Sequence, residues 1–360
     1  MMARIETLQD LIAALLAFGP APALIALRRD DEETWSFESL AERAQRLANG
    51  LPALGVDPGD AVALIGSPSP AWVAVFLGVV AAGAAALPLD PELGETALAR
   101  MLSESRCRLA FVDCAIAKRL RSSERRQFAF DPIPDQPQQS GWQAATSETP
   151  RDLPRVEQDN IALLVYTSGT TGEPKAVPLS HANVAANLNA LLDQELVAAH
   201  DRVLLPLPLH HVYPLVVGLL TPLVSGATIV LPAGLSGPEL GIALRRGVTH
   251  MVGVPRLFAA FTDAIRSGVA AKGWLAAVLF RMMQTVAIAF RRSFGLRVGR
   301  LLFHPLHRRY APDLRLTVSG GAALDPDVEW MLLGLGWDVL AGYGLTETAP
   351  ILAFNRCGKS

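Results

Sequence analysis

The sequence predicts an α/β fold of two stacked subdomains with mostly parallel sheets. Short apolar runs typical of buried strands alternate with helical patterns over residues 1–112 and again over residues 161–347. Apolar residues make up 51% of the 360 residues and charged residues only 18%, so much of the chain must be buried. Strands joined through helices run parallel and are covered on both faces.

The first part of the chain supplies five expected strands separated by helices. We expect strands at residues 23–27, 35–37, 61–65, 84–87 and 109–112, and helices at residues 8–16, 39–47, 70–82 and 95–103. The turn Asp57-Pro58-Gly59-Asp60 precedes the third strand. Residues 131–155 are rich in Pro, Gln, Ser and Thr, which predicts a surface connection.

Two uncharged stretches, residues 68–89 and 203–237, raise the question of transmembrane helices. Proline and glycine interrupt both, so neither is an uninterrupted apolar helix of about 20 residues. We therefore predict buried α/β elements in both stretches. The N-terminus lacks the basic and then apolar layout of a signal peptide.

Charge and cysteine content limit the classes of function. The net charge of −2 gives no global attraction to nucleic acid, so we expect no nucleic-acid partner. The three cysteines, Cys107, Cys114 and Cys357, have neither metal-site spacing nor an even disulfide framework. These features predict a reduced, cytoplasmic protein.

The most informative stretch lies between two apolar runs, at residues 161–178. It holds a dense set of hydroxyl and glycine residues and one lysine: Thr167, Ser168, Gly169, Thr170, Thr171, Gly172 and Lys175. Hydroxyl groups, backbone N–H groups of a glycine turn and one mobile ammonium suit a polyphosphate, and a surface hairpin is the alternative. It is not a Walker loop, because Pro174 and Pro178 separate it from the next helix, expected after the N-cap Ser180.

Two later strands end in loops with chemical potential. After residues 314–318 comes Ser319-Gly320-Gly321-Ala322, where bare backbone leaves room for a flat ring, unless it is only a tight turn. After residues 339–342 comes Tyr343-Gly344-Leu345-Thr346-Glu347-Thr348. A tyrosine can stack on a base, a threonine can bond a phosphate, and a carboxylate can hold Mg²⁺. Ligands of open α/β sheets sit beyond the carboxyl ends of strands, so we expect the three loops to meet.

A histidine doublet follows the expected strand that begins at residue 203. His210 and His211 could form a metal pair, but adjacent side chains on a strand point to opposite faces and no cluster of further ligands accompanies them.

The string Tyr166-Thr167-Ser168-Gly169-Thr170-Thr171-Gly172-Glu173-Pro174-Lys175 resembles the phosphate-loop signature of the adenylate-forming (AMP-binding) superfamily. That superfamily holds acyl-CoA synthetases, peptide-synthetase adenylation domains and luciferases. The resemblance implies that residues 1–360 form a truncated AMP-binding N-terminal domain of the acyl-CoA synthetase type. Residues 56–194 would carry the phosphate loop, residues 1–55 and 195–347 the acyl and adenine pocket, and residues 348–360 an interrupted loop.

The same resemblance implies roles for individual residues. Tyr343 would stack on adenine beside Gly344, Thr346 would contact the α-phosphate, and Glu347 would bind Mg²⁺. Gly320, Gly321 and Ala322 match the segment along the adenine and acyl pocket. His211 matches a position beside the reacting carboxylate, and Lys175 would help to neutralise the phosphates.

The implied reaction is the ATP-dependent activation of a carboxylic acid to an acyl-adenylate and then to acyl-CoA. ATP, Mg²⁺ and CoA are the implied cofactors and co-substrates, and the histidine doublet with the segment 264–312 is similar to long-chain fatty acyl-CoA synthetases. The family continues into a β-barrel and a C-terminal lid, which are absent or incomplete here. We therefore also expect a fragment, a catalytically incomplete nucleotide- or acyl-binding remnant, or half of a split enzyme whose lid is a separate chain. An adenylating enzyme for another carboxylate stays open.

The segment 264–312 contains no Asp or Glu and nine Arg or Lys residues. Apolar residues recur there at helical spacing: Leu275, Leu279, Met283, Val286 and Phe290. A basic amphipathic helix can lie on an anionic membrane, which would place the protein peripherally at the inner membrane surface. The alternative is a helix that faces the core and exposes a solvated basic side.

Overall fold

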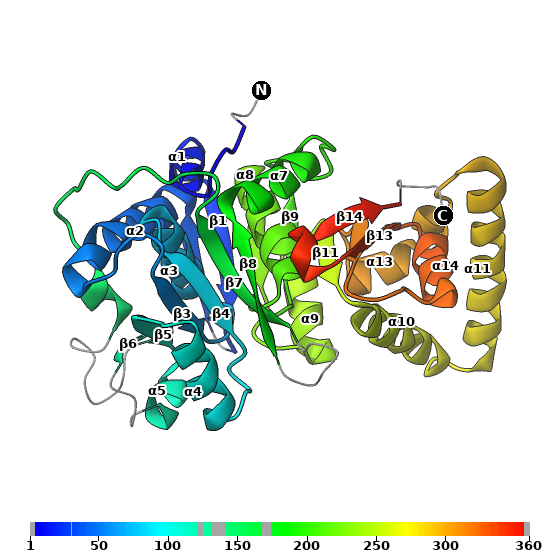
Figure 1. The fold of residues 1–360 in the computed structure, drawn as a ribbon. Helices are drawn as coiled ribbons and strands as arrows, with labels where there is room; N and C mark the ends of the chain where they lie inside the picture. The colour runs from blue at the N-terminus through cyan, green and yellow to red at the C-terminus, as the bar shows by residue number, and fades with distance from the viewer. Residues whose placement is uncertain (1–3, 30, 121–124, 132–140, 168–173, 356–360) are drawn as a thin grey trace.

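The computed structural model describes residues 4–29, 31–120, 125–131, 141–167 and 174–355, and it shows two sheets with helices around them (Figure 1). In the described part of the chain, one sheet has the order β6-β5-β3-β4-β7-β8 and the other the order β14-β13-β12-β11-β9-β10-β1-β2. Most neighbouring strands are parallel. The predicted fold class, a two-sheet, mostly parallel α/β protein, is confirmed.

The six-stranded sheet carries the phosphate-loop hairpin at its edge. Its strands are β3 (Ala61–Ile65), β4 (Ala85–Leu89), β5 (Leu109–Val112), β6 (Arg126–Ala129), β7 (Ile161–Thr167) and β8 (Lys175–Ser180). All neighbours pair in parallel except β7 and β8, which form an antiparallel hairpin. The expected strands at 61–65, 84–87 and 109–112 therefore lie side by side in one sheet.

The eight-stranded sheet has a parallel centre and an antiparallel pair at each edge. Its strands are β1 (Pro22–Leu27), β2 (Glu32–Ser36), β9 (Arg202–Leu204), β10 (Thr228–Leu231), β11 (His250–Gly253), β12 (Leu316–Ser319), β13 (Asp338–Gly344) and β14 (Ile351–Phe354). The antiparallel pairs are β1 with β2 and β13 with β14. The parallel register brings the carboxyl ends of β11, β12 and β13 to one edge.

Helices cover the sheets and separate them. They are α1 (Asp10–Leu16), α2 (Phe37–Gly50), α3 (Pro70–Ala81), α4 (Glu95–Glu104), α5 (Cys114–Arg119), α7 (His181–Leu192), α8 (Thr221–Val224), α9 (Gly237–Leu244), α10 (Pro255–Ala270), α11 (Trp274–Phe294), α12 (Gly299–Leu302), α13 (His304–Tyr310) and α14 (Pro326–Leu335). Every residue of α3 is buried, as the prediction for residues 68–89 requires. One apolar cluster contains α3 together with residues of β1, β3, β7 and β10, so the two sheets share a core.

Helix α7 begins where the sequence predicts. The Ser180 hydroxyl accepts a hydrogen bond from the Asn183 N–H at 3.2 Å, and the Asn183 side chain accepts one from the Ser180 N–H at 3.0 Å. These two bonds satisfy N–H groups that the first helical turn leaves unpaired.

Two segments differ from the prediction. Residues 348–360 were expected to form a loop, but they contain the strand β14, whose backbone pairs with β13. The side chains of β14 are partly buried or exposed. The expected surface connection at 131–155 includes the short helix η2 (Trp142–Ala145), and Trp142 is buried against the core. Both elements are short and lack a periodic apolar pattern, so sequence alone did not mark them.

Among the described helices, α11 is the one long and apolar enough to cross a membrane by length and composition. It has 21 residues and a hydropathy of 1.3, and only 11% of an 18-residue window within it is buried. By contrast, the uncharged stretches flagged in the sequence are core elements.

The buried His181 predicts an acid-sensitive fold. Its Nδ1 accepts a hydrogen bond from the Leu8 N–H at 3.1 Å, and burial lowers its pKa from 6.5 to about 4. The unfolded chain therefore binds a proton that the folded chain resists, so stability present at pH 7 is lost as the pH falls from 6.5 toward 4. His181→Asn keeps an acceptor but does not titrate. We expect the drop in unfolding free energy between pH 7 and pH 4.5 to shrink by about 2–3 kcal/mol in urea titrations; an unchanged drop would contradict this assignment.

Candidate functional site

A cleft of about 1020 Å³ lies at the carboxyl ends of β7, β11, β12 and β13. Its lining includes most of the described residues that the sequence singled out: Thr167, His211, Gly320, Gly321, Ala322, Gly344, Thr346 and Glu347. These residues come from both sheets and from four separate parts of the chain. The rule that ligands bind beyond the carboxyl ends of strands therefore places the cleft correctly.

The phosphate-loop hairpin borders this cleft through Thr167. Lys175 pairs with Thr167 across the hairpin of β7 and β8, and its side chain is exposed. β8 also contacts η4 (Thr346–Thr348), so Lys175 and Glu347 lie on neighbouring elements. Ser168, Gly169, Thr170, Thr171 and Gly172 lie outside the described residues, and their predicted phosphate contacts stay predictions.

Tyr343 occupies a different position from its neighbours. It is 64% exposed, whereas Gly342 and Gly344, one residue to either side on β13, line the cleft. Alternate residues of a strand face opposite ways, so the tyrosine ring lies outside the lining. The ring is mostly exposed, and its stacking on adenine stays a prediction.

Polar contacts fix the turn that carries Thr346 and Glu347. The Leu345 N–H donates to the Thr348 hydroxyl at 3.0 Å, and that hydroxyl donates to the Pro350 carbonyl at 2.6 Å. From α7, the Asn187 amide donates to the carbonyl oxygens of Thr348 at 3.2 Å and of Ile351 at 2.7 Å. The turn is therefore held while the Glu347 carboxylate stays exposed to solvent.

The donor set fits one kind of metal ion. Within the described residues, no group of three or more His, Cys, Asp or Glu side chains could hold a metal. A single exposed carboxylate such as Glu347 suits Mg²⁺, because Mg²⁺ takes one or two carboxylates together with water and substrate phosphate oxygens. His210 and His211 have no third ligand among the described residues.

The histidine doublet is kept uncharged. The ring centroids of His210 and His211 are 4.3 Å apart. Burial and the adjacent His211 lower the pKa of His210 to about 4, although Asp90 opposes the shift. Burial likewise lowers the pKa of His211, again against Asp90. At neutral pH, His211 therefore enters the cleft as a neutral ring that can donate or accept a hydrogen bond.

Tyr213 forms the wall between the ends of β11 and β12. Its hydroxyl lies 2.9 Å from the carbonyl oxygen of Val318 and 3.2 Å from that of Gly253, and its proton serves both. Burial raises the pKa of this hydroxyl, so it stays protonated. Its ring lies so close to Gly320 that a Cβ there would come within 2.6 Å of it. A second close approach occurs at Gly344, where a Cβ would meet the Pro350 carbonyl oxygen at 1.8 Å.

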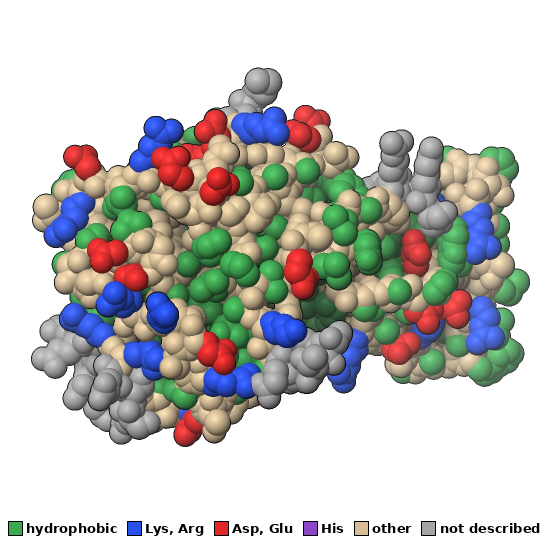
Figure 2. All heavy atoms as spheres, viewed as in Figure 1, with side chains coloured by type: hydrophobic (Ala, Val, Ile, Leu, Met, Phe, Trp, Pro, Cys, Tyr) green, Lys and Arg blue, Asp and Glu red, His purple; other side chains and the backbone are tan. Residues whose placement is uncertain are grey.

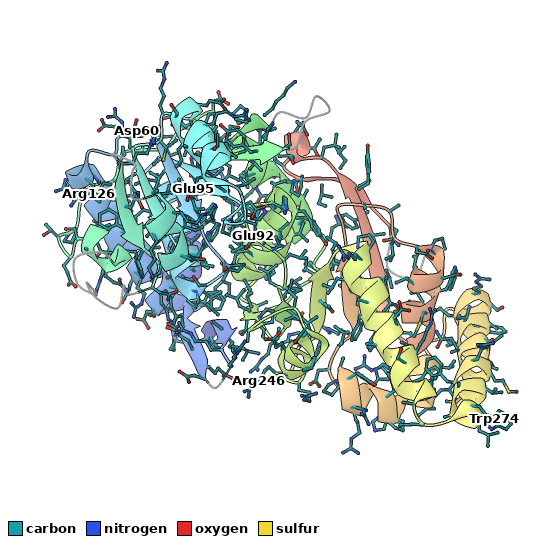
Figure 3. All side chains as sticks on the ribbon, turned by 90° about the horizontal axis from the view of Figure 1, so that it is seen from below. Asp60, Glu92, Glu95, Arg126, Arg246 and Trp274 are labelled. Carbon is teal, nitrogen blue, oxygen red and sulfur yellow. The ribbon has the colours of Figure 1, made fainter. Side chains whose placement is uncertain are left out.

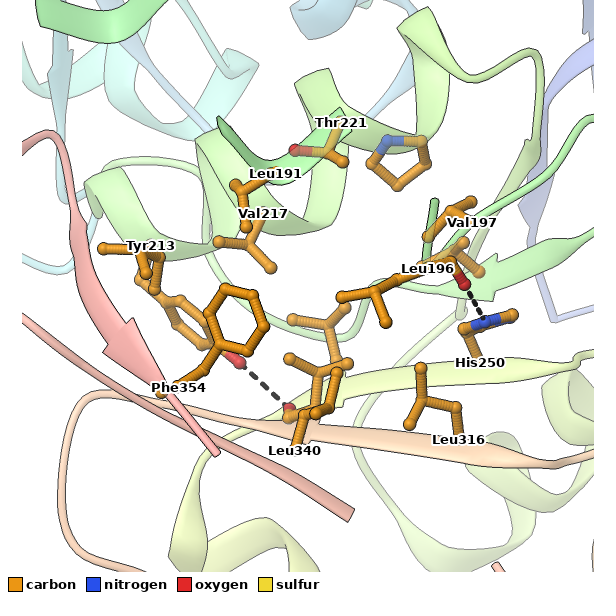
Figure 4. Close-up of a pocket in the computed structure, with 16 residues that line it drawn as sticks. Leu191, Leu196, Val197, Tyr213, Val217, Thr221, His250, Leu316, Leu340 and Phe354 are labelled. Carbon is orange, nitrogen blue, oxygen red and sulfur yellow. Dashed lines mark hydrogen bonds between the residues drawn. The ribbon is translucent and has the colours of Figure 1, made fainter. Parts of the chain in front are cut away.

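An apolar pocket of about 50 Å³ adjoins the cleft (Figure 4). Tyr213, Gly342 and Ile351 line both cavities. Its other walls come from α7, the π-helix η3 (Pro214–Leu220), and strands β9 and β11 to β14. His250 lies at its far side, where its Nε2 bonds the Leu196 carbonyl at 3.1 Å. The walls are almost wholly hydrocarbon, so this pocket suits the apolar part of a ligand.

Sequence reasoning missed three parts of the site. Arg256 lines the cleft from the first turn of α10, three residues after the end of β11, and a cation that follows a strand end was the available signal. Asn187 had no local signal, because its partners lie more than 160 residues away. The apolar pocket had none either, because side chains from many elements make it.

The fold and the cleft at its strand ends define an α/β protein with a ligand-sized cleft, and comparison with known proteins specifies its family. The family model described as AMP-binding enzyme matches residues 16–360, so the chain belongs to the AMP-binding enzyme family. The resemblance read from the phosphate-loop signature is thereby confirmed. The family match does not distinguish the long-chain type from other members of the family.

The relatives differ in substrate. The chain is 30% identical over 324 residues to a feruloyl-CoA synthase of an Amycolatopsis species. The alignment covers 89% of this chain and 56% of that protein. It is 26% identical over 365 residues to the long-chain-fatty-acid–CoA ligase 1 of Saccharomyces cerevisiae, with 87% and 52% covered. The chain thus spans about half the length of these curated relatives. A crystal structure of the anthranilate CoA ligase AuaEII with anthranoyl-AMP aligns over 100% of this chain and 63% of that one, with a TM-score of 0.76; at 22% identity this shows the fold alone.

The contact between Tyr213 and Gly320 predicts a position that tolerates no side chain. In Gly320→Ala, the methyl group must displace the tyrosine ring, and we expect a loss of about 1–3 kcal/mol in unfolding free energy. Gly237→Ala is the matched control, because a Cβ there meets no heavy atom within 4 Å. Urea unfolding of both variants measures the difference, and equal stability of the two would refute the packing described.

Proposed function

We propose that this chain takes part in the ATP-dependent activation of a carboxylic acid. A carboxylate oxygen bonds to the α-phosphorus of ATP, the bond from that phosphorus to the bridging oxygen breaks, and pyrophosphate leaves. The thiolate of CoA then attacks the acyl carbon and forms the C–S bond, while the bond from that carbon to the phosphate oxygen breaks and AMP leaves with the oxygen. The observation that carries the proposal is one cleft lined by Thr167 of the phosphate-loop hairpin and by Thr346 and Glu347 of the loop after β13.

The residues of the cleft have roles that follow from charge. Attack of one anion on another needs alignment and neutralisation more than acid–base chemistry. Lys175 would neutralise the outer phosphates, the Thr346 hydroxyl would bond the α-phosphate, and Glu347 would hold Mg²⁺. The metal, when bound, would neutralise phosphate charge. A neutral His211 would orient the carboxylate without pairing with it as a cation.

The substrate proposed is a fatty acid of long chain. The support is the yeast long-chain relative, together with the apolar walls of the pocket beside the cleft. At about 50 Å³ this pocket would take only a few methylene groups of the chain, so the rest of the chain would lie outside it. The feruloyl-CoA synthase relative supports an aromatic acid instead, which the same walls would also suit. The relatives are about twice as long as this chain, which supports a contribution of a lid domain to the reaction. In this proposal the lid belongs to further residues of the same protein or to a separate protein chain.

Exchange of labelled pyrophosphate into ATP tests the first half-reaction. We expect exchange that depends on added acid and that falls about 100-fold in Glu347→Gln and in Lys175→Ala, because each change removes charge stabilisation from the cleft. Glu42→Gln and Lys118→Ala alter exposed side chains on α2 and α5 and should leave exchange unchanged.

The same assay separates the alternatives. ATP binding without exchange for any acid would replace the ligase proposal with a nucleotide-binding remnant. Exchange with ferulate and none with palmitate would keep the activation chemistry and overturn the fatty-acid substrate.

Filling the apolar pocket tests where the acyl chain lies. Val217 on η3 lines the pocket but not the cleft. We expect Val217→Phe to lower exchange with palmitate at least about tenfold, since the larger ring occupies apolar space that the chain needs. Exchange with acetate serves as the internal control and should persist; an equal loss with both acids would show misfolding or a different path for the chain.

A further inference from the structure

Helix α11 carries an apolar stripe that nothing in the described structure covers. The stripe consists of Leu275, Val278, Leu279, Met282, Val286 and Phe290, which are 40–65% exposed. Their spacing of three and four residues places them on one face. Trp274 and Phe294, at the two ends of the helix, are 74% and 70% exposed. The helix stands at the outer edge of the molecule, beyond α14 (Figure 1), and Trp274 lies at its outermost end (Figure 3).

The opposite face of α11 is fixed to the protein. Gln284 donates to the Met331 carbonyl on α14 at 2.8 Å, and Ala287 is buried. Arg291 forms an ion pair with Asp338 at 2.5 Å, with both side chains less than 10% exposed. This face is also apolar, because Ala287 belongs to a buried apolar cluster and Phe280 and Met283 pack against it. The helix therefore has two apolar faces, and only one of them packs on the core. A second apolar face on a helix at the surface indicates a further partner.

Charge around the stripe indicates the nature of that partner. The segment 264–312 has nine Arg or Lys residues and no Asp or Glu. Arg281 and Arg292 lie on α11, and Lys272 and Arg297 flank its two ends; all four are exposed. Acidic side chains also lie nearby, because Asp327 lines a pocket with Arg281 and Asp338 pairs with Arg297. Figure 2 shows hydrophobic, basic and acidic side chains at this end of the molecule. An apolar stripe with basic side chains on the same helix and at both of its ends is complementary to an anionic lipid bilayer, in which acyl chains lie beneath negative headgroups.

We propose that α11 docks this chain on an anionic membrane surface, with the stripe inserted at the headgroup–acyl boundary. A symmetric pairing of two copies through α11 would bring the basic side chains of both copies together, which opposes it. If α11 crossed the membrane, the buried Arg291–Asp338 ion pair would break and the contacts between α11 and α14 would be lost. We therefore expect α11 to lie along the membrane surface. The proposal concerns an interaction surface and holds whichever acid the cleft activates.

Flotation with lipid vesicles tests the proposal on the intact chain. We expect binding to vesicles of phosphatidylcholine with phosphatidylglycerol, much weaker binding to phosphatidylcholine alone, and loss of binding at high salt. The triple variant Leu275→Ser, Leu279→Ser, Met282→Ser should lower the partition coefficient more than about tenfold, because three insertable side chains are removed. Lys272→Glu with Arg281→Glu should lower it about tenfold or more for the anionic vesicles alone, because both charges lie on or next to α11.

A matched triple variant on other surfaces is the control. Leu16, Leu235 and Ile242 are 48%, 62% and 47% exposed and lie away from α11. Their replacement by Ser should leave vesicle binding unchanged. Failure of the unmodified chain to float with anionic vesicles would overturn the proposal. So would a dimer on size exclusion that the α11 triple variant abolishes, because the stripe would then bind a second copy.

Discussion

The site depends on the packing of one side chain, Tyr213, against the ends of two parallel strands. Its hydroxyl ties the Gly253 carbonyl of β11 to the Val318 carbonyl of β12, and its ring fills the space that a Cβ on Gly320 would need. The same ring lines both the cleft and the apolar pocket. A buried hydroxyl without such partners would be strongly destabilising, so the bonds and the ring position enforce each other. The polar and apolar parts of a ligand would therefore meet at a rigid wall.

A second constraint holds the two sheets in register at the cleft. The cleft takes Thr167 from one sheet and Glu347 from the far end of the other, so its geometry depends on how these sheets pack. The shared apolar core around α3 fixes their separation. Asn187 then fixes the orientation of the turn after β13. It lies on α7, the helix that follows β8, and its amide donates hydrogen bonds to two carbonyl oxygens there. Apolar packing sets how close the sheets lie, and hydrogen bonds set how they are aligned.

Sequence predicted those features that local physics controls. Residues 61–65 are a continuous apolar run and form a strand that is buried along its whole length. Ser180 begins a helix because its hydroxyl accepts a hydrogen bond from an otherwise unpaired N–H group. β14 and Arg256 escaped prediction although each had a weak local signal: β14 is a short apolar run, and Arg256 is a cation that follows a strand end. The apolar pocket escaped for a different reason: it exists only after η3 and the strands have packed. Local pattern fixes an element, whereas a cavity belongs to the tertiary structure.

Helix α11 shows the limit of periodicity most clearly. Hydrophobic spacing at Leu275, Leu279, Val286 and Phe290 predicts an apolar face, but the same spacing serves a core, a second copy or a bilayer. The exposure of these side chains excludes the protein's own core as the partner of this face, and it leaves a second copy and a bilayer. The basic side chains on α11 and at its ends then disfavour a second copy, because like charges would approach across a symmetric contact. If the cleft activates a fatty acid, a membrane-docked helix would also keep the enzyme beside the phase in which such an acid concentrates, so surface and pocket would favour the same class of ligand.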